Sequence, residues 1–230
     1  RLSKTGSSDY VEYTAHLNRC PEEYDRFLEE VTINVTEFFR NPETFAAIVE
    51  KVLPKLDFSR PLRVWCAGTS FGEEAYSMAI LFQEAFGNNA AERKVAIMGT
   101  DIDPLCVEKA RAGLYEPSQL KEVDTYLLEK YFLKEGESFR VKDEIKRLTE
   151  FKAHNVISDA PFENIGLILC RNLMIYFTRA LQETVYPLLL ESLNPGGFLV
   201  LGKVETLWGA AQNYFETVDN HERIYRKISV

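Results

Sequence analysis

The sequence predicts a doubly wound α/β domain, and three observations point to this fold class. Segments typical of strands and helices alternate along residues 62–201. One apolar run, residues 64–67, stops at Gly68, and residues 72–74 then open a helix, which is the layout of nucleotide-type cofactor sites in parallel sheets. Polar residues follow four of the predicted strands, where open α/β sheets bind their ligands.

Composition narrows the class of protein. The 230 residues, 46% of them hydrophobic, suffice for one packed domain and an accessory part. A net charge of -8 argues against bulk attraction to nucleic acid or anionic lipid. The cysteines form no C-x-x-C pair and the histidines show no metal-ligand spacing, so we expect free thiols and no metal site. With no membrane-spanning apolar run and no signal peptide, we expect a cytoplasmic protein that does not insert into a membrane.

The first 40 residues read as the remnant of an N-terminal helical domain and a linker. Residues 1–8 are polar and expected to fray, whereas residues 10–17 and 21–31 predict short helices. Asn41 is a suitable N-cap and Pro42 a suitable first residue for the next helix, whose apolar positions repeat at helical spacing. Pro54 is expected to end that helix.

Residues 41–230 read as the α/β domain. Its predicted strands are 62–67, 95–100, 148–153, 166–170 and 198–201, and its helices 72–86, 104–112 and 178–193. Two final β segments, 214–218 and 223–228, predict an antiparallel edge. Residues 114–147 interrupt the alternation with a helix and a small antiparallel hairpin, an inserted β-subdomain of the kind that often carries recognition.

The glycine loop carries chemistry that does not suit a phosphate. It holds no Lys or Arg, and Glu73 and Glu74 stand at the helix start. Two carboxylates would repel a pyrophosphate but suit a nucleoside that carries an ammonium and a sulfonium, so the loop suggests S-adenosylmethionine. The alternative is a well-capped helix after a core strand, because acidic residues favour helix N-termini in any case.

The residues after the later strands are the other candidates for a site. Asp101 could bind both ribose hydroxyls, or it could form an Asx-turn or cap the helix at Pro104, a role that Asp103 could equally fill. Arg171 directly follows a buried strand, which is costly unless the side chain is paired or faces a ligand. Arg40 could orient a carboxylate, or simply pair at the surface with a nearby acid.

At this point the sequence resembles a known family. It contains, in order, TINVTEFFRNP, WCAGTSFGEEAYSMA, GTDIDPLCVEKARAGLY, LILCRNLMIYF and NPGGFLVLG, which are similar to motifs of the chemotaxis receptor methyltransferases, the CheR family. The resemblance implies a Rossmann-like methyltransferase domain with an inserted β-subdomain and a helical N-terminal domain. It implies methylation of glutamates on the cytoplasmic helices of methyl-accepting chemoreceptors, with S-adenosylmethionine converted to S-adenosylhomocysteine. We expect a monomer with no nucleic-acid partner.

The resemblance also implies site residues. The cofactor contacts would be Asn34, Thr36, Arg40, Gly68, Glu74, Asp101, Asn155, Val156, Arg171 and Asn172. Tyr176 matches a family tyrosine close to the transferred methyl, and the motif match favours Glu74 over Glu73. Arg40 and Arg171 are the candidates to orient carboxylates of the substrate or the cofactor. The chain departs from the family at residues 202–205, Gly-Lys-Val-Glu, where Gly-His-Ser-Glu is common. The alternatives are a methyltransferase of the same fold with another acceptor, or a non-catalytic module that binds S-adenosylmethionine.

Overall fold

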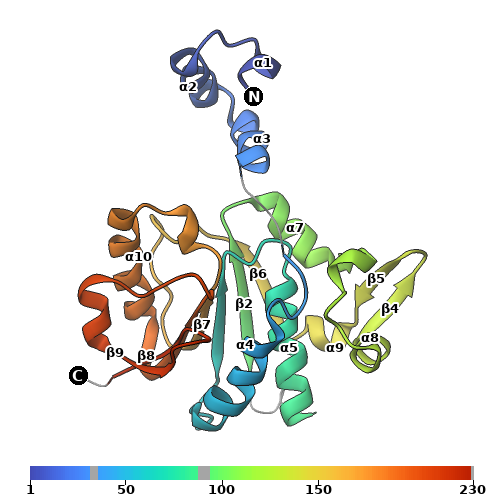
Figure 1. Ribbon diagram of the computed structural model, residues 1–230. Coiled ribbons are helices and arrows are strands. Elements are labelled where there is room, and N and C mark those ends of the chain that lie inside the picture. Colours follow the sequence, from blue (N-terminus) through green and yellow to red (C-terminus); the bar gives the residue numbers. More distant parts are fainter. Residues whose placement is uncertain (32–35, 88–93, 229–230) are drawn as a thin grey trace.

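The computed structural model describes residues 1–31, 36–87 and 94–228, and its centre is a seven-stranded sheet (Figure 1). The strand order is β6-β2-β1-β7-β8-β10-β9. β6, β2, β1, β7 and β8 run parallel, and β10 pairs antiparallel with both β8 and β9. The predicted α/β fold with an antiparallel edge is therefore confirmed. The strands are β1 Arg63–Ala67, β2 Ala96–Asp101, β6 Thr149–Ala153, β7 Ile165–Cys170, β8 Leu193–Leu201, β9 Phe215–Asp219 and β10 Ile224–Lys227.

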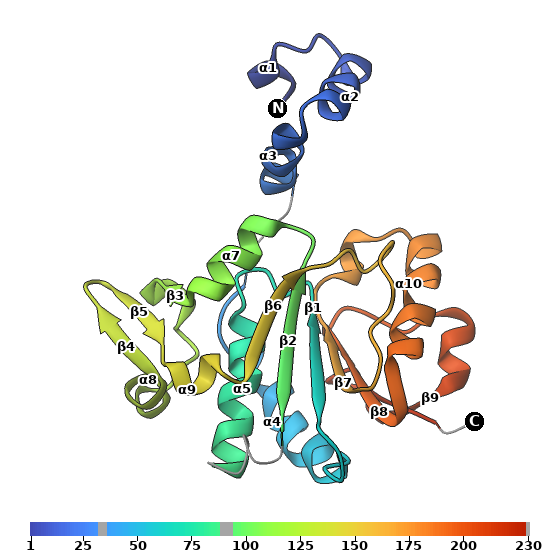
Figure 2. The same cartoon turned by 180° about the vertical axis from the view of Figure 1, so that it is seen from behind.

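The alternation of side chains along β1 divides the core into two halves. Val64 and Cys66 belong to the larger cluster, which also holds buried residues of α4 (Pro42–Ala47) and α5 (Glu73–Phe86). Trp65 and Ala67 point to the opposite face and pack with α10 (Arg179–Ser192). Figure 2 shows the sheet with β6, β2 and β1 in front of α4 and α5. Because both faces are covered, the parallel strands are nearly continuous apolar runs.

The segment after Asn41 differs from the predicted regular helix. α4 passes into a π-helical segment, Ile48–Val52, and then a 3₁₀ turn, Leu53–Lys55. Pro54 has no N–H to donate to the carbonyl four residues earlier, so the hydrogen-bond spacing changes before the chain turns away. The prediction that Asn41 caps the helix is also wrong, because its side chain makes no capping hydrogen bond and its φ is 62°.

The insertion forms a second sheet beside the main body. The predicted helix and hairpin are present as α8 (Thr125–Tyr131), β4 (Phe132–Glu135) and β5 (Ser138–Val141). A third strand, β3 (Leu114–Tyr115), was not predicted, and the sheet order is β3-β5-β4. α9 (Asp143–Lys146) leads back into β6 and contacts α5. Two residues are too few for an alternating pattern to show in a sequence.

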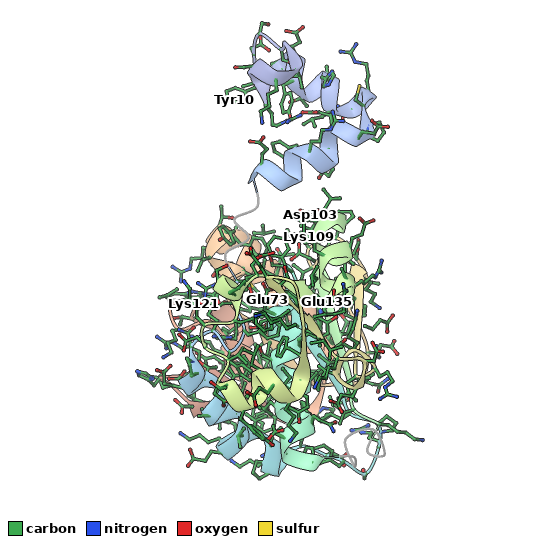
Figure 3. All side chains as sticks on the ribbon, turned by 90° about the vertical axis from the view of Figure 1, so that its right-hand side faces the viewer. Tyr10, Glu73, Asp103, Lys109, Lys121 and Glu135 are labelled. Carbon is green, nitrogen blue, oxygen red and sulfur yellow. The ribbon has the colours of Figure 1, made fainter. Side chains whose placement is uncertain are left out.

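The N-terminal helices lie apart from the main body, as the position of Tyr10 in Figure 3 shows. They are α1 (Leu2–Thr5), α2 (Tyr10–Arg19) and α3 (Pro21–Val31), and α3 approaches α7 (Pro104–Ala112). α1 replaces the predicted frayed end: Arg1 Nε donates to Glu23 Oε1 at 2.8 Å, and that oxygen also accepts from the Tyr13 hydroxyl at 3.1 Å. One further boundary differs, since β8 begins at Leu193 rather than at residue 198.

Candidate cofactor-binding and active site

A cavity of about 420 Å³ opens where β1, β2, β6 and β7 end. Its wall contains residues from four of the five quoted motifs, and NPGGFLVLG (residues 194–202) contributes none. Every predicted site residue in the described part of the chain lines it: Thr36, Arg40, Gly68, Glu74, Asp101, Asn155, Val156, Arg171, Asn172 and Tyr176. Asn34 lies outside the described residues. The carboxyl ends of parallel strands meet at one edge of a sheet, and this brings side chains from distant segments together.

The loop after β1 is held against the end of β2. The N–H groups of Gly68 and Thr69 both donate to the Thr100 carbonyl at 2.9 Å. Gly68 has φ 72°, which a glycine adopts without strain. Gly72, at φ 94°, packs so closely that a Cβ there would lie 2.9 Å from the Cβ of Ala110. These two glycines let the chain turn from strand to helix directly beneath the cavity.

Arg171 is the most tightly held charge in the cavity wall. Its Nη1 lies 3.0 Å from Glu74 Oε2. Its Nη2 donates to the Arg40 carbonyl at 2.7 Å and to Asn41 Oδ1 at 2.9 Å. Only 5% of Arg171 is exposed. This explains why Asn41 does not cap α4: its side-chain oxygen accepts from the guanidinium instead. Burial raises the pKa of Glu74, and the charge of Arg171 opposes that shift.

Glu73 and Glu74, adjacent in sequence, occupy different environments. Consecutive helical residues point about 100° apart. Glu74 lines the cavity, whereas Glu73 is fully buried, and Gln119 of the insertion donates to its Oε1 at 2.5 Å. Burial raises the pKa of Glu73 to about 7. The geometry therefore agrees with the choice of Glu74 as the cavity residue.

Asp101 makes the Asx-turn that the sequence allowed as an alternative, and Asp103 caps the next helix. Asp103 caps α7, since its Oδ1 accepts from the Leu105 N–H at 2.9 Å. Asp101 accepts from the Ser70 N–H at 2.8 Å and the Asp103 N–H at 3.1 Å, one on each oxygen. Burial raises the pKa of Asp101, and the backbone hydrogen bonds oppose the shift. Each carboxylate oxygen can accept more than one hydrogen bond, so Asp101 can still accept from hydroxyls in the cavity.

The loop after β6 supplies the apolar part of the wall. Asn155 Oδ1 accepts from the Ile157 N–H at 3.0 Å, an Asx-turn that presents Val156 and Ile157 to the cavity. His154 packs between Trp65 and Phe162, with its Nδ1 3.5 Å from Asp159. Burial lowers the pKa of His154, which favours its neutral form.

Glu205 is a structural element of the site to which the sequence assigned no role. Its Oε2 accepts from the N–H groups of Gly202 at 2.5 Å and Asn172 at 2.9 Å, and its Oε1 from that of Ile175 at 3.3 Å. The carboxylate thereby fixes the loop that ends at Tyr176, which is 53% exposed at the cavity. Its position four residues after β8 is the signal that could have revealed it, since the other strand-end polar residues pointed to the same edge.

The residues present fit S-adenosylmethionine. Two buried polar atoms of the wall, Thr69 Oγ1 and Arg171 Nε, have no hydrogen-bond partner within the described residues. Glu74 could hold an ammonium, Arg171 a carboxylate and Asp101 a ribose, beside an apolar surface suited to a base. The Rossmann-like sheet and this site define a methyltransferase that uses S-adenosylmethionine.

Comparison with known proteins agrees. The family model "CheR methyltransferase, SAM binding domain" matches residues 34–224, and the chain belongs to this family. The chain is 34% identical to an uncharacterized 104.1 kDa protein of Rhodobacter capsulatus, over 96% of this chain and 23% of that protein. It is 32% identical to a chemotaxis protein methyltransferase of Listeria innocua, over 92% and 80% of the two chains. With the Salmonella typhimurium chemotaxis protein methyltransferase, identity is 34% over 89% and 72%.

Two features are absent from residues 1–31, 36–87 and 94–228. There, no three or more His, Cys, Asp or Glu side chains gather in a way that could hold a metal ion. No helix in those ranges is both long and apolar enough to cross a membrane.

Proposed function

We propose that this protein transfers a methyl group from S-adenosylmethionine to glutamate side chains on the cytoplasmic helices of methyl-accepting chemoreceptors. The observation that carries the proposal is the convergence of Glu74, Asp101 and Arg171 on one cavity in a chain of this family. The names of the Listeria and Salmonella relatives support a role in chemotaxis. The reaction would take place in the cytoplasm, with the protein acting as a monomer.

The chemistry asks the protein for positioning rather than proton transfer. S-adenosylmethionine, when bound, supplies a methyl group on a positively charged sulfur. A glutamate acceptor is already ionised at neutral pH, so no general base is required. This suits a cavity whose histidine, His154, packs against aromatic rings and has a lowered pKa.

Three side chains would provide that positioning. Arg40 and Arg171 offer guanidinium groups that bind carboxylates of the acceptor or the cofactor, and Tyr176 offers a hydroxyl near the opening. Alignment of two reacting groups can supply ~7–11 kcal/mol of the barrier reduction. The network that fixes Arg171, through Glu74, Asn41 and the Arg40 carbonyl, would keep that alignment ready before the acceptor arrives.

A transfer assay tests this function. The protein is incubated with methyl-labelled S-adenosylmethionine and a panel of chemoreceptor cytoplasmic fragments. We expect label that is released as methanol by mild base, which is the behaviour of a glutamyl methyl ester. The control is the same fragment with the acceptor glutamates replaced by aspartate. Base-stable label would indicate another acceptor atom. Tight cofactor binding without transfer to any fragment would instead indicate a regulatory module.

A further inference from the structure

The apolar side chain of Val204 is exposed in the turn that follows β8. The Glu205 N–H donates to the Gly202 carbonyl at 2.9 Å, which closes a turn with Lys203 and Val204 at its centre. Neither Lys203 nor Val204 has a positive φ, so the turn is compatible with most residue types and does not require a valine. Val204 is 77% exposed. Single exposed apolar residues are common at protein surfaces, so Val204 matters here because further exposed apolar residues lie close to it.

This turn is fixed to the mouth of the cofactor cavity. The Glu205 carboxylate binds the backbone of Asn172 and Ile175, so the turn and the loop that lines the cavity are held together. Ile175 and Tyr176 in that loop are about half exposed. Trp208, four residues after Val204, is also exposed. We call Ile175, Tyr176, Val204 and Trp208 the apolar rim.

A positive charge accompanies the apolar rim. The guanidinium of Arg179, at the start of α10, stacks over the ring of Trp208 at 4.7 Å. No ion pair holds Arg179 in the described part of the chain. Lys203, in the same turn as Val204, differs from it because acidic partners hold its ammonium: Glu43 at 3.1 Å and Glu222 at 3.5 Å. The rim therefore joins apolar surface to one cation that is available to an incoming carboxylate.

We infer that the apolar rim docks the acceptor segment of a protein substrate, an amphipathic helix in which apolar residues flank the methylated glutamate. The inference rests on the proposed function. Residues three or four positions apart lie on one face of a helix, so a helix can place a carboxylate in the cavity and its apolar neighbours on the rim. A further acidic residue of that helix would pair with Arg179. A small-molecule acceptor would fit inside the cavity and would leave the rim in water.

The test compares two exposed valines. Val204→Asp places a charge on the rim, and Val49→Asp places the same charge on a valine that is 47% exposed and does not line the cavity. Initial rates are measured against the concentration of a chemoreceptor cytoplasmic fragment. We expect Val204→Asp to raise KM for the fragment about tenfold, which corresponds to ~1.4 kcal/mol of binding. kcat and the Kd for S-adenosylhomocysteine should not change, and Val49→Asp should match the wild type.

A milder variant guards against misfolding, and each outcome bears on the inference. Val204→Thr keeps the shape of the side chain and should raise KM by a smaller factor, about two- to threefold. If the fragment is methylated with equal KM by the wild type and Val204→Asp, the apolar rim does not dock the acceptor segment, and the proposed function is unaffected. If Val204→Asp binds S-adenosylhomocysteine more weakly than the wild type, the turn stabilises the cofactor cavity and does not dock the acceptor. A change in oligomeric mass on gel filtration would assign the rim to a second copy. A wild-type protein that methylates no fragment would overturn both proposals.

Discussion

The charged side chains at the two ends of the parallel strands differ in how deeply they are buried. At the carboxyl ends, Asp101, Arg171 and Glu205 are buried and bound to protein groups. At the amino ends, a smaller groove of about 90 Å³ is lined by the basic residues Lys55, Arg60, Arg63 and Arg226. These side chains reach solvent, and the Arg60 side chain is 51% exposed. The charges at the carboxyl ends are thus buried, whereas those at the amino ends are exposed or only partly buried.

This difference in burial indicates that the carboxyl ends of the strands form the binding site. Burying an ion pair costs desolvation energy that the attraction between the ions often only balances, so a cluster of buried charges adds little to stability. Exposed charges such as Arg60, whose Nε lies 3.4 Å from Asp57 Oδ2, cost little and contribute little. At the carboxyl edge, therefore, burying the charged side chains costs desolvation energy, and the same contacts fix the positions of those side chains.

Removing one arginine at each end of the parallel strands should give the largest difference in stability and activity. Arg171→Ala leaves Glu74 buried without its partner, which should lower the free energy of unfolding by ~3–5 kcal/mol. It also removes a positioning group, so kcat/KM should fall at least ~100-fold. Arg60→Ala, at the exposed end, should change stability by less than ~0.5 kcal/mol and leave activity unchanged. Urea unfolding and methyl-transfer rates measure both. Normal turnover in folded Arg171→Ala would remove Arg171 from the site.

A pH series sharpens the comparison through Glu73. Its pKa is about 7 in the folded protein, above the usual value of 4.5. The folded state therefore keeps a proton that the unfolded chain releases between those values, so stability should fall as pH rises through this range. The loss should reach ~3 kcal/mol between about pH 4.5 and pH 8, from ~1.4 kcal/mol per pKa unit.

The matched variants are Glu73→Gln and Glu216→Gln. Glutamine cannot ionise, so Glu73→Gln should lack this part of the pH dependence in urea unfolding. Glu216, an exposed partner of Arg226 at 3.5 Å, should retain the wild-type dependence when replaced. Parallel stability curves for the wild type and Glu73→Gln would contradict the assignment of the buried proton.

The same contrast explains what the sequence could predict. The convergence of Gly68, Asp101, Asn155 and Arg171 follows from the alternation, because parallel strands deliver their carboxyl ends to one edge. The alternation did not predict the order of the strands in the sheet. An apolar run followed by a polar residue can be recognised directly in the sequence. The positions of these residues on the wall of one cavity therefore needed no knowledge of side-chain packing.

Partnerships between distant segments were not predictable in this way. Glu73 and Glu74 differ because Gln119 of the insertion reaches one and Arg171 the other, contacts that join residues far apart in sequence. Glu205 is bound to backbone groups some 30 residues earlier in the chain. Local rules gave Asn41 a capping role that tertiary contact replaced with an acceptor role.

Asn41 supports the smallest of these tests. Its φ of 62° favours glycine, so Asn41→Gly removes the side-chain oxygen that accepts from Arg171 without straining the backbone. The Arg40 carbonyl remains as an acceptor, so we expect a loss of only ~1–2 kcal/mol and a fall in kcat/KM below ~10-fold. Asn164→Gly, at φ 60° in the exposed loop before β7, removes an asparagine at the amino end and should be neutral within ~0.5 kcal/mol. Asn41→Asp keeps the acceptor and should restore activity, which separates positioning of Arg171 from a general loosening of the loop. Equal activity in Asn41→Gly and Asn164→Gly would show that the Arg40 carbonyl and Glu74 alone suffice to hold Arg171.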